Sequence, residues 1–343
     1  MINERLNNNY DFLRIFAATC ICFTHSFNLL NKDGFEPLMR ISGSQYDFSF
    51  IGLSIFFSVS GYLITKSVYT SSSLQSYFWK RFLRIQPLLM IVCVLSVFII
   101  GPVFTTLPAT EYFKIPETYS YFRNIFPATG IQFVLPGVFA DNFHPNVVNG
   151  SLWTLVVEER LYLLVSVFFF FKKQGKSFAL LVLLFNIMVT LKSVFFQGSV
   201  LEYLKGSHIF YALLFLNAGA LYQVGFDFKY FAKRKLSWIA LFLLVLSFFY
   251  SFLQFLQVLI IPLCVIMVAN VRAATNNAAK WGDFTYGVYI FSFPVQQIFI
   301  AIKLVPENPY LLFVVTMSTV LPLGALSWHL LEKKCLRHKD LVA

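Results

Sequence analysis

Ten apolar runs of about 20 residues each follow one another along this chain, and they restrict its fold more than any other feature. A helix of this length crosses the hydrocarbon core of a bilayer, because it satisfies its backbone hydrogen bonds internally. The runs occupy residues 10–30, 47–66, 85–104, 152–171, 177–196, 208–224, 236–251, 253–271, 284–303 and 310–331. Residues 236–271 are continuously apolar, and Gln254 and Gln257 indicate a tight turn within them. The sequence predicts an all-α, polytopic transmembrane bundle of about ten spans.

Composition agrees with a membrane location. Of the 343 residues, 58% are hydrophobic and 13% are charged, whereas soluble domains have about 45–50% apolar and about 25% charged residues. The net charge of +11 would also suit nucleic-acid binding, but the Lys and Arg residues lie in short clusters between apolar runs and not on a soluble face. We therefore expect membrane lipid as a partner and no nucleic acid.

The distribution of positive charge predicts the orientation of the spans. With the N-terminus inside, the inner segments hold 18 of the 27 Lys and Arg residues and the outer segments hold 7, a bias that marks the cytoplasmic side. Both termini are then cytoplasmic, and residues 1–343 form a single transmembrane domain without an appended soluble domain. Because no small-residue cleavage site follows the first run, we interpret it as a retained span and not as a removed signal peptide.

Residues 105–151 form a long outer loop that is rich in proline and aromatic residues. Disordered linkers carry few aromatic residues, so we expect this loop to fold over the outer mouth of the bundle. Four of the five cysteines lie inside apolar runs, and none has the spacing with histidines that is typical of a metal site. We interpret them as small hydrophobic residues and predict no metal.

Arg14 and His25 lie within the first run, where an ionisable side chain is costly and is therefore a functional candidate. They are eleven residues apart, so both lie on one helix face, about 16 Å apart along the axis. Asp11 lies one turn before Arg14 and can pair with it. In the alternative interpretation, Arg14 anchors the inner end of the helix and His25 only packs.

Glu158 and Glu159 are adjacent carboxylates inside the fourth run. Glu158 is expected about 9 Å below the outer start of its helix and His25 about 8 Å below the outer edge, so the two can meet at one level. A carboxylate beside a histidine sets its tautomer and makes it a general base. Glu159 could be neutralised by Arg160 or by a neighbouring helix, and a purely structural polar network is the alternative.

Arg81 and Arg84 lie one turn apart just before the third run. Arginine side chains in this arrangement suit phosphate binding. Ordinary positive-inside anchoring explains them equally well.

Five segments, in order along the chain, resemble motifs of the acyltransferase-3 family of membrane acyltransferases. The Arg14–His25 pair resembles the signature of the first helix. The other segments are 56–64 (FFSVSGYLI), 80–87 (KRFLRIQP), 149–159 (NGSLWTLVVEE) and 285–294 (TYGVYIFSFP). Two positions depart from the family pattern: Gln86 stands where Tyr is commoner, and Ser292 stands where His is frequent, which argues against a catalytic role for that position.

The resemblance implies a ten-helix O-acyltransferase that takes acyl groups, usually acetyl, from cytoplasmic acyl-CoA. Acyl-CoA is then a co-substrate, and no tightly bound cofactor is expected. The usual acceptors in this family are sugar hydroxyls of bacterial surface polysaccharide, lipopolysaccharide or peptidoglycan. The resemblance therefore implies a carbohydrate or glycolipid acceptor and a location in the bacterial inner membrane.

The residues and the resemblance together predict a mechanism. His25 takes the proton from an acceptor hydroxyl, and Glu158 orients or stabilises it. The predicted binding residues are Arg14, Arg81 and Arg84 for acyl-CoA and Trp153 and Ser60 for substrate. Trp153 is either a sugar platform or a membrane-interface residue, and transfer of the acyl group first to His25 stays open.

Two other classes of protein are alternatives. A glycolipid or polysaccharide transporter or flippase also carries intramembrane charges, but it predicts inverted repeats or broken helices at matching positions, which the sequence does not show. A non-catalytic assembly subunit would leave the predicted common level of His25 and Glu158 without a role.

Overall fold

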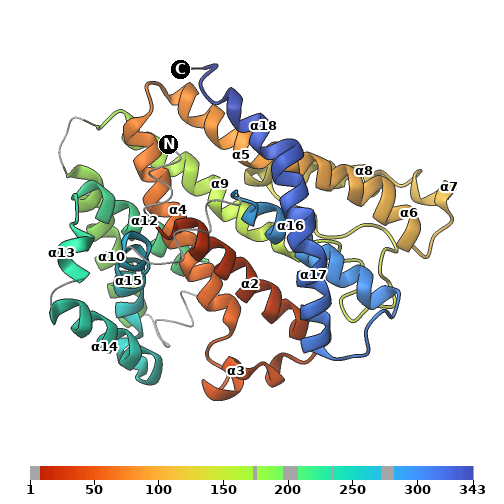
Figure 1. Cartoon of the computed structure of the whole chain (residues 1–343), viewed down its shortest axis with the longest axis horizontal. Helices are drawn as coiled ribbons and strands as arrows, with labels where there is room; N and C mark the ends of the chain where they lie inside the picture. The colour runs from red at the N-terminus through yellow and green to blue at the C-terminus, as the bar shows by residue number, and fades with distance from the viewer. Residues whose placement is uncertain (1–7, 173–175, 196–207, 233–234, 272–281, 343) are drawn as a thin grey trace. The chain divides into compact units, whose positions relative to one another are not determined.

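A computed structural model describes residues 8–172, 176–195, 208–232, 235–271 and 282–342 (Figure 1). Within these ranges the chain is helical and forms no strand, and two isolated bridges join Thr105 to Val138 and Val134 to Val147. The predicted all-α class is confirmed. Several basic residues of the charge count lie outside the described residues: Arg5, Lys173, Lys205, Lys233, Arg234, Arg272 and Lys280.

Each of the ten apolar runs contains a helix. They are α2 (Tyr10–Asn28), α4 (Phe48–Thr70), α5 (Leu74–Leu95), α9 (Trp153–Ser166), α10 (Ser177–Phe195), α12 (Ile209–Gln223), α14 (Lys235–Phe249), α15 (Gln257–Asn270), α16 (Thr285–Ala301) and α17 (Pro309–Ser327). Among the described residues, four helical stretches have the length and hydropathy of a span: Phe48–Thr70, Leu74–Phe104, Leu253–Asn270 and Pro309–His338. The chain is thus a helical membrane protein, while the number of spans and the cytoplasmic location of both termini stay predictions.

The long apolar stretch 236–271 is broken where its glutamines predicted a turn. Helix α14 ends at Phe249, a 3-10 segment η7 (Ser251–Leu256) follows, and α15 begins at Gln257. The Gln257 side chain donates to the Ser247 carbonyl at 3.1 Å. A glutamine at the start of α15 therefore fastens it to the end of α14.

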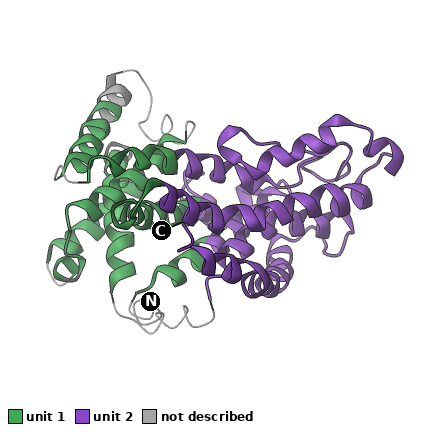
Figure 2. Ribbon diagram, turned by 90° about the horizontal axis from the view of Figure 1, so that it is seen from above, with its two compact units in different colours: residues 1–17, 50–74, 161–281 green, residues 18–49, 75–160, 282–343 purple. Residues whose placement is uncertain are grey.

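Two compact units divide the chain (Figure 2). Unit 1 comprises residues 1–17, 50–74 and 161–281, and unit 2 comprises residues 18–49, 75–160 and 282–343. Four of the five boundaries fall inside helices, because α2, α4, α5 and α9 each contribute to both units. The single domain 1–343 stays a prediction.

Unit 1 has its own apolar core, formed by α4, α12, α13 (Phe228–Ala232), α14, α15 and the first half of α2. Gly61 on α4 permits close helix packing, since a Cβ atom there would lie 2.0 Å from the Phe215 carbonyl oxygen on α12. Asn186 and Asn217 are buried and donate to each other at 2.8 and 3.0 Å. Such amide pairs join helices where water is excluded.

Unit 2 is built around α16, with α2, α5, α9 and α17 beside it. Helices α16 and α17 approach closely at two glycines, since a Cβ atom on Gly287 would lie 2.8 Å from the Gly324 Cα atom. Two π-helical turns extend long helices of this unit, η2 (Ser96–Ile100) after α5 and η9 (Trp328–Glu332) after α17. A π turn inside a helix frequently lies at a functional site.

The long loop 105–151 is folded, as its aromatic content predicted. It contains α7 (Ala109–Tyr112), α8 (Pro116–Ser120) and two 3-10 turns, η3 (Tyr121–Ile125) and η4 (Pro127–Thr129). Tyr112 is fully buried, and its hydroxyl donates to the Val97 carbonyl at 3.1 Å. Burial raises the pKa of Tyr112 to about 12, so this phenol stays protonated and keeps its hydrogen bond at physiological pH.

Candidate functional site

Helix α16 fastens to the second half of α2 through Gln296. Its side-chain nitrogen donates to the Ser26 hydroxyl at 2.7 Å and to the Cys22 carbonyl at 3.0 Å. All three residues are buried. Because a buried amide leaves its partners unsatisfied if it moves away, this contact fixes α16 alongside α2 at the level of His25.

His25 lies against the edge of the Phe293 ring, with ring centroids 5.3 Å apart and planes at 80°. Its Nδ1 atom is buried and has no hydrogen-bond partner among the described residues, although the residue as a whole is partly exposed. The imidazole is therefore held by packing, and its hydrogen-bonding capacity is unused by the protein. A buried polar atom without a partner is unusual, and the partly exposed ring leaves the imidazole within reach of a substrate.

The Asn-Gly-Ser sequence before α9 packs onto the same part of α16. Asn149 accepts from the Ser151 amide at 3.1 Å and donates to the Ile290 carbonyl at 3.0 Å, which caps the short helix η5 (Gly150–Leu152). A Cβ atom on Gly150 would lie 2.6 Å from the Phe293 ring. Asn149 is therefore needed for its two hydrogen bonds, and Gly150 is needed because a larger side chain would clash with Phe293.

Helix α9 runs antiparallel to α16 from this point. Tyr289 lies opposite Thr154, with 2.6 Å between their hydroxyl oxygens, and its hydroxyl also contacts the Ser151 carbonyl at 2.8 Å. Trp153, the predicted sugar platform, lies at the start of α9 and is partly exposed. The motif thus presents Trp153 near the His25 level and leads α9 away from it.

Glu158 lies nearer to the first residue of α16 than His25 does. It is buried, and its charge acts on Tyr286 and Tyr289 of α16 and on Tyr77 of α5. His25 contacts α16 at Phe293, two turns from Tyr286, which corresponds to about 10 Å along the helix axis. No hydrogen bond joins His25 to Glu158 among the described residues, so the predicted pairing is not a direct contact, and a shared catalytic role stays a prediction.

Glu159 is held by a neighbouring helix. Its carboxylate accepts from the Gln86 side chain at 2.6 Å and from the Ala128 amide at 2.9 Å. Arg160 instead is exposed and donates to the Ala128 carbonyl at 3.3 Å. Gln86, which departs from the family pattern, therefore receives a carboxylate as its partner.

Arg84 is held between two buried carboxylates. One guanidinium nitrogen lies 2.9 Å from Asp283 and the other 3.4 Å from Glu332. Ser327 donates to the other carboxylate oxygen of Glu332 at 2.9 Å, and the Trp328 ring centroid lies 6.0 Å from the guanidinium carbon of Arg84. With both carboxylates ionised, this cluster carries one excess negative charge, so a phosphate would have to compete with two carboxylates for Arg84.

Arg81 lies one turn before Arg84 on α5 and is partly buried. Its charge and that of Glu158 both act on the buried Tyr77, so these three residues lie together. We call this group, with Arg84, Asp283, Tyr286 and Glu332, the carboxylate end of α16. We call His25, Phe293, Gln297 and His144 the histidine end.

Two predicted site residues belong to unit 1. Arg14 is partly exposed on the first half of α2, and Ser60 is buried in α4. Arg14 lies on the same helix as His25, eleven residues earlier. Their predicted roles in binding acyl-CoA and substrate stay predictions.

The sequence reasoning missed three residues. Asp283 directly precedes the ninth apolar run, and Glu332 directly follows the tenth. A carboxylate so close to a membrane span is uncommon, and this could have indicated both residues from the sequence. His144 lies in the long loop, and its Nε2 atom is 2.9 Å from the Asn28 carbonyl at the end of α2. No sequence signal marks His144, because only the fold brings it to α2.

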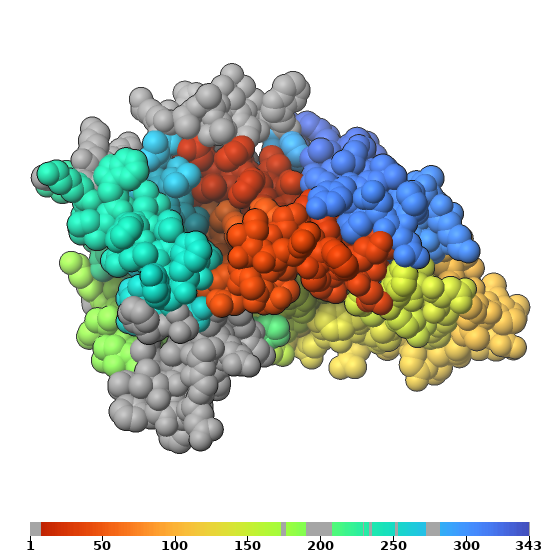
Figure 3. Space-filling view, turned by 90° about the horizontal axis from the view of Figure 1, so that it is seen from below, coloured from red at the N-terminus to blue at the C-terminus, as the bar shows by residue number. Residues whose placement is uncertain are grey.

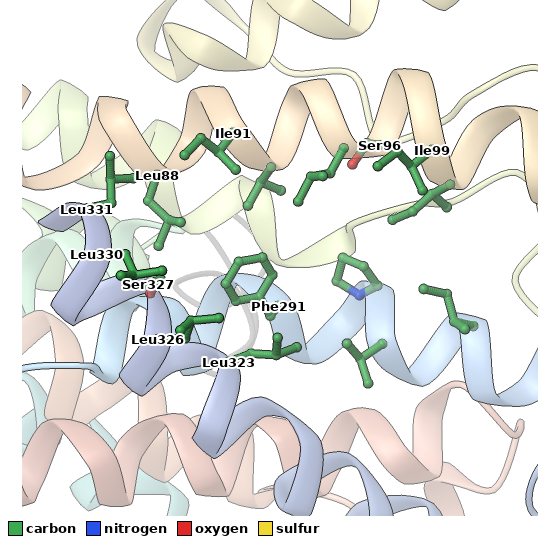
Figure 4. A pocket seen from close by; sticks show the side chains of 16 residues that line it. Leu88, Ile91, Ser96, Ile99, Phe291, Leu323, Leu326, Ser327, Leu330 and Leu331 are labelled. Carbon is green, nitrogen blue, oxygen red and sulfur yellow. The ribbon is translucent and has the colours of Figure 1, made fainter.

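A separate apolar groove of about 400 Å³ lies between α5 with η2, α16, and α17 with η9 (Figure 4). Of its lining residues only Ser96 and Ser327 are polar. The groove therefore offers almost no hydrogen-bond partner for a sugar or a phosphate. In this it differs from both ends of α16, which carry ionisable side chains. Among the described residues, no group of three His, Cys, Asp or Glu side chains is placed to hold a metal ion.

The apolar helices and the buried ionisable groups define a membrane protein with a polar site inside its bundle. The chain matches the acyltransferase-3 family, described as an acyltransferase domain, over residues 7–328, and so belongs to this family. It is 29% identical to an O-acetyl transferase of Shigella phage Sf6, with 96% of each chain covered. It is 27% identical to nodulation protein 10 of Rhizobium leguminosarum bv. viciae, with 96% of this chain and 93% of that one covered. No solved structure matches.

Proposed function

We propose that this acyltransferase moves an acetyl group from cytoplasmic acetyl-CoA to a hydroxyl of a cell-surface carbohydrate in the bacterial inner membrane. The observation that carries the proposal is the state of His25. It is packed against Phe293, partly exposed, and without a hydrogen-bond partner at its buried Nδ1 atom. In a family of acyltransferases, an imidazole in this state suits proton transfer to and from a substrate.

The reaction needs one base that also returns its proton. The acceptor hydroxyl attacks the thioester carbonyl, a C–O bond forms, and the C–S bond breaks. His25 takes the hydroxyl proton and then delivers it to the thiolate of coenzyme A, so atoms and charges balance. Glu158, whose charge acts on Tyr289 and Tyr286, one and two turns from Phe293, favours the transient imidazolium through its negative charge.

The donor is assigned to the carboxylate end. Arg81 is the better phosphate contact, because Arg84 already faces two carboxylates. A role of Arg14 in donor binding stays a prediction from the sequence. The pantetheine arm of acetyl-CoA is long and thin enough to reach from such a cluster to His25.

Purified protein in phospholipid nanodiscs, incubated with radiolabelled acetyl-CoA and bacterial surface glycans, tests the proposal. We expect label on carbohydrate that mild alkali releases, as it does from an ester. The His25→Ala variant should transfer no label, whereas His329→Ala, which removes an exposed histidine, should match the wild type. If a folded wild-type protein labels none of the glycans, the carbohydrate acceptor is wrong. If His25→Ala labels them normally, the assigned base is wrong.

A further inference from the structure

A second histidine lies one turn beyond His25 along α2. The Nε2 atom of His144 is 2.9 Å from the carbonyl oxygen of Asn28, the last residue of α2 and three residues after His25. Residues three apart lie on the same face of a helix, about 4.5 Å apart along its axis. His144 is also close enough to His25 to interact with it electrostatically. The histidine from the long loop is therefore a neighbour of the predicted catalytic base.

Helix α16 holds the segment around His144 in the same register. Gln297 donates to the carbonyls of His144 and Val147 at 3.0 and 2.7 Å, and Asn142 donates to the Gln297 side chain at 2.8 Å. Gln297 lies one turn after Phe293, the residue that contacts His25. Two helices thus independently place His144 one turn beyond His25.

This part of unit 2 is accessible. Figure 3 shows the segment after α2 in orange, the loop before η5 in yellow-green and the start of α17 in blue, adjoining on one face. Lys32 donates to the Glu307 carbonyl and joins two of these segments. His144 itself is partly exposed.

The hydrogen bond to Asn28 fixes the tautomer of His144. A carbonyl oxygen only accepts, so Nε2 must carry the hydrogen. In a neutral imidazole the other nitrogen then has a free lone pair. Nδ1 of His144 has no hydrogen-bond partner among the described residues, and it is not sealed from solvent. His144 is therefore a fixed hydrogen-bond acceptor beside the partly exposed ring of His25.

We propose that His144 binds the carbohydrate acceptor through a hydroxyl next to the one that reacts. This inference rests on the proposed function, in which the proton of the reacting hydroxyl goes to His25. A sugar presents several neighbouring hydroxyls, and a second one can donate to Nδ1 of His144. Two imidazoles one turn apart would then bind two neighbouring hydroxyls. The hydrogen bond to His144 would thereby determine which hydroxyl faces the thioester. Its role is acceptor affinity and regioselectivity, not proton transfer.

The test compares two substitutions at this position. His144→Phe keeps the ring shape but loses both nitrogen atoms, and loss of one neutral hydrogen bond should raise the KM for the acceptor about three- to tenfold. The KM for acetyl-CoA and the rate of acetyl-CoA hydrolysis should not change, and the acetyl group should spread to neighbouring hydroxyls of the product. His144→Gln carries an amide that can donate to Asn28 and accept from a hydroxyl, so it should restore most of the acceptor affinity.

Phe143→Leu is the matched control, because Phe143 is the exposed neighbour of His144 in the same segment and should leave both KM values unchanged. An unchanged acceptor KM in His144→Phe would overturn the inference. So would an equal rise of both KM values with lower thermal stability, which marks a structural role. If the wild-type protein acetylates no carbohydrate, the proposed function fails and this inference with it. If the wild-type protein acetylates carbohydrate and His144→Phe has an unchanged acceptor KM, the inference about His144 is wrong but the proposed function stands.

Discussion

The two ends of α16 treat their ionisable side chains in opposite ways. At the carboxylate end, Arg84, Asp283 and Glu332 are joined by ion pairs, and both carboxylates are buried. At the histidine end, His25 and His144 are partly exposed, and each has a ring nitrogen without a hydrogen-bond partner among the described residues. At the carboxylate end, an arginine of the protein pairs with two carboxylates, whereas at the histidine end no ion pair forms among the described residues and two imidazoles are partly exposed.

This difference separates stability from chemistry. A buried ion pair contributes little net stability, but loss of one partner is costly because an uncompensated charge remains. A histidine held only by packing costs little to remove and has its lone pairs available for reaction. We therefore expect substitutions at the carboxylate end to change folding first and substitutions at the histidine end to change turnover first.

The largest effect is expected for His25→Ala. General acid–base catalysis contributes about 10²–10⁴ to the rate, so turnover should fall by that factor. Because His25 makes no hydrogen bond that the protein would lose, the thermal unfolding temperature should stay close to that of the wild type. Steady-state transfer and thermal unfolding in the same detergent measure both quantities. A variant that unfolds early but turns over normally would reverse the comparison between the two ends.

Arg84→Ala should mainly lower stability. It leaves Asp283 and Glu332 facing each other without a cation, and breaking such a buried pair costs about 3–5 kcal/mol. Adding Asp283→Asn and Glu332→Gln removes the repulsion and should restore part of the loss. Denaturant unfolding of the single and triple variants measures it.

Arg81→Ala, one turn before Arg84 on α5, should affect donor binding more than stability. If Arg81 binds a phosphate, the KM for acetyl-CoA should rise about ten- to hundredfold, since a charge-assisted hydrogen bond contributes about 1.5–3 kcal/mol. Arg84→Ala with normal stability and a raised KM for acetyl-CoA would show instead that Arg84 binds the donor.

The helices could be predicted from the sequence because lipid leaves a membrane-spanning segment few alternatives. All ten apolar runs contain a helix, and the break at residues 250–256 lies where two glutamines interrupt the apolar stretch. The short helices of the loop 105–151 and the π turns η2 and η9 could not be predicted. They depend on contacts such as that of Tyr112 with Val97, which join residues from different parts of the chain.

The sequence names candidate site residues, which stay predictions, but it does not give the heights at which neighbouring helices place them. The depth of Glu158 was counted from the start of its apolar run, and this treats all helices as starting in one plane. In the structure, a Cβ atom on Gly150 would lie 2.6 Å from the Phe293 ring, so α9 is placed by its contact with α16, and the charge of Glu158 acts on Tyr289 and Tyr286, one and two turns from Phe293. The partners of Arg84 and the position of His144 likewise depend on residues distant along the chain, which no local pattern indicates.

Glu158→Gln tests whether charge at one end acts on chemistry at the other. At about 10 Å and an effective dielectric constant of about 20, a carboxylate stabilises an imidazolium by about 1.7 kcal/mol. Turnover should therefore fall about tenfold, with an unchanged KM for the acceptor, because the charge on His25 develops only in the transition state. Normal turnover together with a lower unfolding temperature would make Glu158 a structural residue of the carboxylate end.

The smallest effect is expected for Ser292→Ala. Ser292 is buried on α16, one residue before Phe293, in the segment 285–294 that resembles a family motif. Its hydroxyl donates to the Val288 carbonyl of its own helix at 2.5 Å, a bond that a helix does not need because that carbonyl is already in the helical ladder. Turnover and both KM values should therefore stay within about twofold of the wild type, since removal of one small side chain that makes no essential contact has a small effect. Ser292 lies next to the histidine end without belonging to it. A loss of tenfold or more in turnover would extend the histidine end by one residue.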